Sequence, residues 1–76
     1  MSFKLVNLST NFEPVVYQTL QAAKKAAFDD GGRIWWIATH LLNIEEDEES
    51  TWAGSSLGTP QAAGDIEYKI YEDKEG

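Results

Sequence analysis

The alternation of apolar and polar residues near the start of this 76-residue chain predicts two short strands. Residues 3–8 (FKLVNL) place apolar side chains on both sides of an extended segment, and residues 14–18 (PVVYQ) form the second strand. The intervening STNFE has turn composition, so the two strands are expected to form a hairpin. Pro14 favours an edge position for the second strand, because an edge tolerates the missing N–H.

A helix is predicted next, with Thr19 as its N-cap and Gly31 or Gly32 as its C-cap. At 100° per residue, the polar side chains Gln21, Lys24 and Lys25 share one arc and are expected to face solvent. The small apolar side chains share the opposite arc and should pack closely on a sheet: Leu20, Ala22, Ala23, Ala26 and Ala27.

Residues 33–42 (RIWWIATHLL) are rich in β-branched and aromatic side chains and predict a central strand. Both faces of this strand would be largely apolar, with Trp35 and Trp36 pointing to opposite sides. A single helix covers one side of a sheet, so one tryptophan is expected at the surface. Residues 50–54 (STWAG) predict a short strand paired back to 33–42, and residues 55–64 predict a loop.

Residues 65–72 (DIEYKIYE) form the clearest amphipathic strand, with Ile66, Tyr68 and Ile70 predicted to point inward. The last residues, 72–76, are predicted to be a frayed tail. Together these elements predict a single α+β domain over residues 1–76. Its expected architecture is an antiparallel sheet of four or five strands with one helix packed on a face, in the order ββαβ(β)β.

Composition narrows the function classes. The chain is 42% hydrophobic and contains three Trp, three Tyr and three Phe, which is typical of a folded domain rather than a disordered acidic chain. It has no cysteine, which excludes disulfides and thiolate chemistry. No segment approaches the length of a membrane span, so we expect a cytoplasmic protein without membrane partners.

Charge is distributed unevenly. Residues 1–33 contain three acids and four bases, whereas residues 34–76 contain ten acids and two bases, and the formal net charge is −7. Between Ile34 and Tyr68 there is no Lys or Arg. Direct nucleic-acid binding is not expected, because neutralising phosphates requires a basic patch. A basic protein partner fits this field better.

The sequence contains no pattern typical of an enzyme, a cofactor site or a metal site. His40 is the only histidine, and no motif supplies it with a nucleophile or an orienting partner. DDGG at residues 29–32 lacks the spacing and the lysine of a nucleotide-binding loop. The acidic segment lacks the alternating acids and the central glycine of a calcium loop. We therefore expect no catalytic residues, no cofactor and no specific metal ion.

Five consecutive acids are the most unusual feature of the chain: Glu45, Glu46, Asp47, Glu48 and Glu49. We call this segment the acidic run. An extended chain advances about 3.3 Å per residue, and one strand of B-DNA has one charge per roughly 3.4 Å. The run could thus imitate a short length of phosphate backbone, with Asp65 and Glu67 alongside it. The alternative is a solvated loop. Trp35 and Trp52 are the candidate apolar anchors beside it, since aromatic residues are favoured at interface hot spots.

The acidic run, the cation-free span 34–68 and the small size resemble accessory proteins of bacteriophages and mobile elements, among them anti-CRISPR proteins. The resemblance implies a phage protein that acts as a DNA mimic and an inhibitor in evasion of host defence. Its partner would be a basic protein or ribonucleoprotein complex, such as a CRISPR effector, in the cytoplasm of the bacterial host. The second hypothesis is a small structural or assembly protein that self-associates, as a homodimer for example, through the second apolar face of residues 33–42. Its acids would then serve solubility only.

Overall fold

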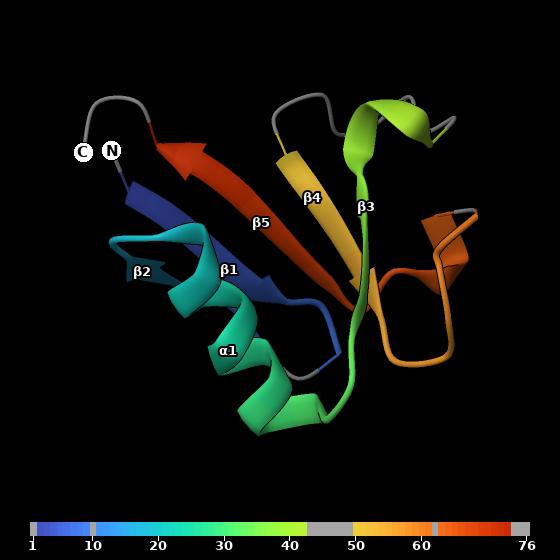
Figure 1. The fold of residues 1–76 in the computed structure, drawn as a ribbon, viewed down its shortest axis with the longest axis horizontal. Coiled ribbons are helices and arrows are strands. Elements are labelled where there is room, and N and C mark those ends of the chain that lie inside the picture. Colours follow the sequence, from blue (N-terminus) through green and yellow to red (C-terminus); the bar gives the residue numbers. More distant parts are fainter. Residues whose placement is uncertain (1, 10, 43–49, 62, 74–76) are drawn as a thin grey trace.

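One helix packs on one face of a five-stranded antiparallel sheet in the computed structural model, which describes residues 2–9, 11–42, 50–61 and 63–73 (Figure 1). The strands lie in the order β2-β1-β5-β4-β3 across the sheet. Along the chain the elements are β1 (Ser2–Asn7), β2 (Asn11–Tyr17), α1 (Leu20–Gly31), β3 (Trp35–Ala38), the 3₁₀ turn η1 (Thr39–Leu41), β4 (Ser50–Ser55), the 3₁₀ turn η2 (Ala63–Asp65) and β5 (Tyr68–Asp73). The predicted α+β class and element order are confirmed.

The hairpin of β1 and β2 is confirmed, with a register from Phe3 opposite Tyr17 to Asn7 opposite Asn11. β2 begins earlier than predicted, so Pro14 lies inside the strand rather than at its first position. β2 is nevertheless an edge strand, as expected from Pro14, because its only neighbour in the sheet is β1.

Both predicted caps of α1 are present. The hydroxyl of Thr19 accepts a hydrogen bond from the N–H of Ala22 at 3.0 Å. At the other end, Gly32 has φ 80° and its N–H donates to the carbonyl of Phe28 at 2.8 Å. A helix needs about 20 apolar residues to span a bilayer, and no helix in the described part of the chain has that length and hydropathy.

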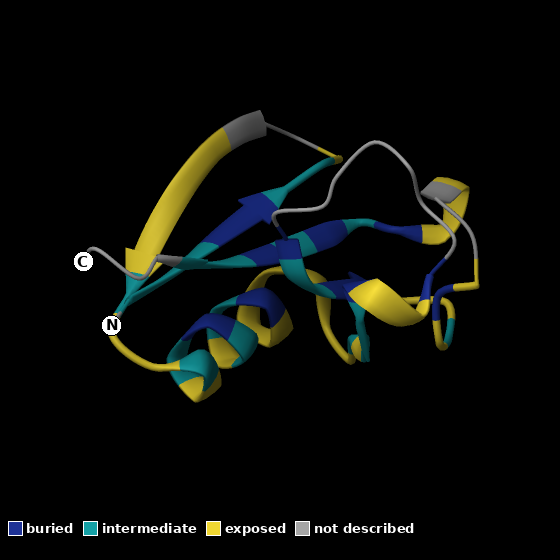
Figure 2. Cartoon of the chain, turned by 90° about the horizontal axis from the view of Figure 1, so that it is seen from above, coloured by how far each residue is buried: buried dark blue, intermediate teal, exposed yellow. Residues whose placement is uncertain are grey.

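The first core cluster lies between α1 and the sheet. Ala23 and Ala27 are completely buried, and their small side chains let the helix approach the sheet closely (Figure 2). The sheet contributes Leu5, Tyr68 and Ile70 to this cluster. Further side chains pack around it: Phe3, Tyr17, Leu20, Ala26, Ile34, Trp36 and Trp52. The predicted helix face is therefore the packing face.

The prediction of a central strand over residues 33–42 is wrong in two respects. β3 covers only four residues and lies at the edge of the sheet. The chain leaves the strand because residues 39–41 form η1, in which the N–H of Leu42 donates to the carbonyl of Thr39 at 2.9 Å. The turn brings Leu42 into a second buried cluster with Ala53 and Ile66, against which Ile37 also packs. Burial of these side chains favours the turn over a longer strand.

β5 also differs from its predicted range. Ile66, Tyr68 and Ile70 are all buried, as predicted, but Ile66 belongs to the second cluster whereas the other two belong to the first. The strand starts only at Tyr68, because the preceding segment bends through η2. At the other end, the predicted frayed tail is wrong for residues 72 and 73, which pair with β1. Residues 74–76 lie outside the described residues.

Candidate protein-binding surface

The acidic run, Glu45–Glu49, lies outside the described residues, but both of its attachment points are described. The run connects Leu42, which is buried after η1, to Ser50, which is buried at the start of β4. The hydroxyl of Ser50 donates a hydrogen bond to the hydroxyl of Thr39 at 3.2 Å, and both side chains are buried. The fold thus holds the two ends of the run at one end of the β3–β4 pair.

Asp65 and Glu67 lie at the opposite end of β4 from these attachment points. The N–H of Glu67 donates to the carbonyl of Gly54, near the end of β4, whereas the run joins at Ser50. Five residue steps of strand correspond to about 17 Å. The predicted grouping of Asp65 and Glu67 with the run is therefore one in which the acids lie toward both ends of the same strand pair.

Glu67 makes short hydrogen bonds within the chain. Its Oε2 atom accepts from the N–H and from the hydroxyl of Ser56, each at 2.6 Å. The hydroxyl bond and then the backbone bond lower the pKa of Glu67 below its ordinary value. The carboxylate thus closes the loop between β4 and β5, while Asp65 remains exposed.

The two candidate tryptophan anchors have different environments. Trp35, the first residue of β3, is 48% exposed, which confirms the expectation that one tryptophan reaches the surface. Trp52 is half-buried and packs against the helix-face cluster. The Nζ atom of Lys24 lies 4.5 Å from the centre of the Trp52 ring. Lys24 therefore covers an aromatic face instead of extending into solvent, contrary to the prediction for its arc of the helix.

A polar contact between helix and sheet was not predicted from the sequence. Oδ2 of Asp30 accepts hydrogen bonds from the hydroxyl of Tyr68 and from Nδ2 of Asn7, both at 2.8 Å. Burial, followed by the hydrogen bond and the charge of Asp30, raises the pKa of Tyr68 to about 12. Tyr68 is consequently a neutral donor at ordinary pH, and the contact holds the end of α1 against β5. The signal in the sequence was the DDGG segment, which was interpreted only as a helix end.

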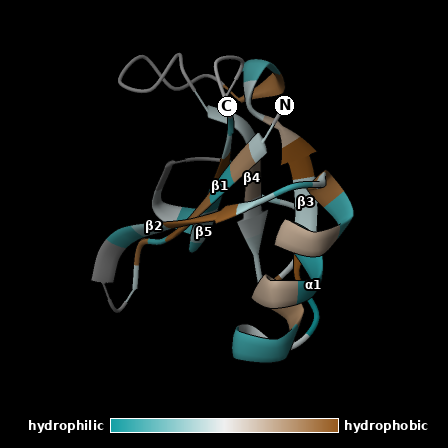
Figure 3. Cartoon of the chain, turned by 90° about the vertical axis from the view of Figure 1, so that its left-hand side faces the viewer, coloured by the Kyte–Doolittle hydropathy of each residue, from teal (hydrophilic) through white to brown (hydrophobic). Residues whose placement is uncertain are grey.

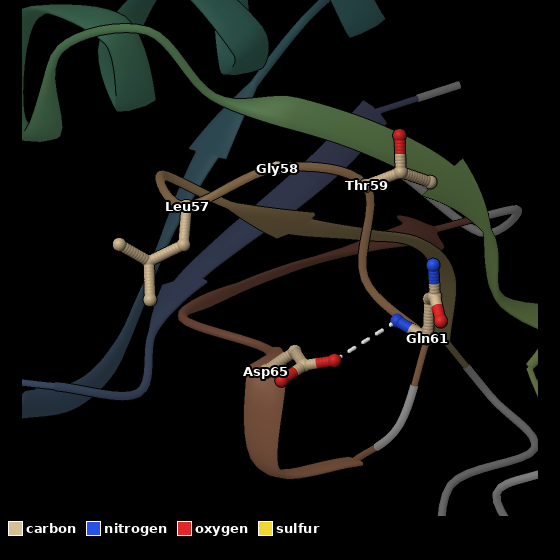
Figure 4. A pocket seen from close by; sticks show the side chains of 5 residues that line it. All are labelled: Leu57, Gly58, Thr59, Gln61 and Asp65. Atoms are coloured by element: carbon tan, nitrogen blue, oxygen red, sulfur yellow. Dashed lines mark hydrogen bonds between the residues drawn. The ribbon is translucent and has the colours of Figure 1, made fainter.

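A shallow depression of about 200 Å³ lies in the loop between β4 and β5 (Figure 4). It is lined by Leu57, Gly58, Thr59, Gln61 and Asp65. The Asp65 carboxylate there accepts a hydrogen bond from the N–H of Gln61 at 3.1 Å. Ligand pockets usually have volumes of about 300 Å³ or more, so this depression does not indicate a small-molecule site.

Titratable side chains do not converge in the described part of the chain. His40 is exposed in η1. Within the same residues, no group of three or more His, Cys, Asp or Glu side chains could hold a metal ion. The described geometry thus provides surfaces rather than a reaction site.

Comparisons with protein-family models, with curated proteins and with solved structures found no match.

Proposed function

We propose that this chain is a non-enzymatic inhibitor that binds a basic nucleic-acid-handling protein complex by imitating a phosphate backbone, in the manner of anti-CRISPR proteins. The observation that supports the proposal most strongly is the segregation of charge. Residues 34–68 contain seven acids, five of them consecutive, and no Lys or Arg. Such a surface attracts a cationic channel at long range and competes with nucleic acid for it.

The position of the run in the fold supports the same proposal. Its ends are attached at the buried Thr39–Ser50 pair, so the charges stay close to the edge of the sheet. Tethering at both ends lowers the conformational entropy that a partner must remove when it binds the segment. The exposed carboxylate of Asp65 adds a further negative charge, whereas Glu67 already has partners in Ser56.

Trp35 is the better candidate for an apolar anchor. It is half exposed, whereas the ring of Trp52 is covered by Lys24. An aromatic side chain buried on binding contributes affinity that salt does not screen. Binding is therefore expected to have a salt-sensitive part from the acidic run and a salt-resistant part from Trp35.

Affinity capture from a bacterial lysate tests the proposal. The wild-type chain is expected to retain basic nucleic-acid-binding proteins, which added duplex DNA or high salt then displaces. The variant E46K/E48K/E49K should lose them. A matched control, E13K/D29K/E72K, changes the net charge equally at positions outside the run and should keep them. Equal retention by the E46K/E48K/E49K variant would exclude charge mimicry.

The second candidate function is self-association through the apolar face of residues 33–42. The exposure of Trp35 favours it, but Ile37 on the same face already packs against the cluster of Leu42, Ala53 and Ile66. Sedimentation at high salt separates the two functions. A stable dimer that dissociates in the variant W35E supports assembly, whereas a monomer at all concentrations excludes it.

A further inference from the structure

The two edges of the sheet are protected to different degrees. β2, at one edge, contains Glu13 and Pro14. A charged side chain and a proline both discourage the addition of another strand to an open edge. β3, at the other edge, has the sequence WWIA and contains neither. In Figure 3, β3 shows no hydrophilic colour along its length.

The backbone of β3 has hydrogen-bonding groups available on its outer side. In the described part of the chain, β3 pairs only with β4, through a register from Trp35 opposite Ser55 to Ala38 opposite Trp52. An antiparallel ladder uses the N–H and C=O groups of alternate residues. The groups of the other residues therefore point outward, away from β4. Figure 1 shows β3 in front, with no segment of the chain drawn over it.

We propose that β3 is a docking edge to which an extended, Lys/Arg-rich segment of a partner protein adds as a sixth strand. The inference rests on the proposed function, because it takes the partner to be basic. It adds how the partner is held: main-chain hydrogen bonds to β3 provide affinity and register, and the surrounding charge selects a cationic sequence.

Charge complementarity favours this occupant over a second copy of the chain. Beyond the last residue of β3, the chain continues through η1 to the acidic run. Before its first residue lie the exposed Asp29 and Asp30 at the end of α1, with Arg33 as the nearest cation. A basic strand along β3 would thus extend toward acids at each end, whereas a second copy would bring another net charge of −7.

Trp35 gives this edge a further preference. Its side chain is 48% exposed at the start of β3, and cross-strand neighbours of an aromatic residue include β-branched side chains and long cationic side chains. We therefore expect the added strand to alternate Lys or Arg with Val, Ile or Thr. Such a sequence presents β-branched residues to one face and cations to the other.

The test uses an eight-residue peptide that alternates Lys and Val, together with a control peptide in which two central Val residues are replaced by Pro. Amide hydrogen exchange is followed by NMR on the full chain. The alternating peptide is expected to slow exchange at the outward-facing N–H groups of residues 35–38. The Pro peptide keeps the charge but lacks main-chain donors, so its affinity should be about tenfold lower. Equal affinity of the two peptides, or unchanged exchange in β3, would overturn the proposal.

A variant of the acidic run separates this inference from the function on which it rests. In E45Q/E46Q/D47N/E48Q/E49Q the run is neutral while β3 is unaltered. If the alternating peptide binds this variant as well as the wild type, the charge proposal fails. If it binds the wild type more tightly but never protects β3, charge recognition holds and strand addition fails. A dimer of the free protein with β3 already protected would identify a second copy as the occupant and overturn the proposal.

Discussion

The hydroxyl of Tyr68 donates a hydrogen bond to Oδ2 of Asp30 at 2.8 Å and thereby connects β5 to the last turn of α1. Tyr68 is only 5% exposed, so this acceptor satisfies a largely buried donor. The residue that follows Asp30 is a glycine, and a Cβ atom at Gly31 would collide with the same hydroxyl. The helix end is therefore fitted to the tyrosine.

This contact predicts an asymmetry between two substitutions. D30A leaves the Tyr68 hydroxyl without its acceptor and should lower the free energy of unfolding by about 1–3 kcal/mol. Y68F removes the donor and retains the ring, so its cost should be smaller, about 0.5–1.5 kcal/mol. Urea unfolding measures both. The control is D29A, at the exposed neighbouring position, which should be neutral. A larger loss for Y68F than for D30A would contradict the role of the contact.

Stability at alkaline pH should depend on the same hydroxyl. The pKa of Tyr68 is about 12 in the folded protein, against roughly 10 in an unfolded chain. Between these values the folded state binds more protons than the unfolded state, so stability falls as pH rises. The contribution is complete below pH 10 and is lost as pH rises through about 12. Unfolding measured from pH 8 to 12 should show this loss in the wild type, and Y68F should lack it.

Short-range chemistry made part of the fold predictable from sequence. The caps of α1 depend on Thr19 and Gly32, and its packing face depends on the spacing of Ala23 and Ala27. These features involve residues within a few positions of one another. The contact between Asp30 and Tyr68 spans 38 positions, and no local pattern indicates it.

The edge position of β3 was missed for a related reason. Its composition is that of a buried strand, and the first cluster does bury one side of it through Ile34 and Trp36. Strand order depends on pairings between distant segments, which composition does not encode. Of the candidate site, the sequence indicated the surface position of one tryptophan. It did not indicate that Glu67 is occupied by Ser56 or that Lys24 covers Trp52.

Gly54 should tolerate no side chain. A Cβ atom there would lie 2.6 Å from Cγ2 of Ile34 and 2.7 Å from Cζ3 of Trp36. G54A should therefore lower the free energy of unfolding by about 1–3 kcal/mol through overpacking. The matched control is G64A, because nothing lies within 4 Å of a Cβ at Gly64. Thermal unfolding compares the two, and equal midpoints would contradict the packing of β4 against Ile34 and Trp36.

Lys24 and Lys25 form a natural pair for testing the contact with Trp52. The Lys24 ammonium lies over the Trp52 ring, whereas Lys25 is exposed. K24Q should cost about 0.5–1 kcal/mol of stability and alter the tryptophan fluorescence. K25Q removes the same charge and should do neither. If the two variants behave alike, the effect is one of net charge and the cation–π contact contributes nothing measurable.

The most direct test of the central claim is the salt dependence of binding to a basic nucleic-acid-binding protein captured by the wild-type chain. Charge mimicry predicts that affinity falls roughly tenfold or more between 50 and 200 mM salt. It also predicts that E45Q/E46Q/D47N/E48Q/E49Q binds more weakly at low salt and responds little to salt. Affinity that is independent of salt, or unchanged in this variant, would contradict the account.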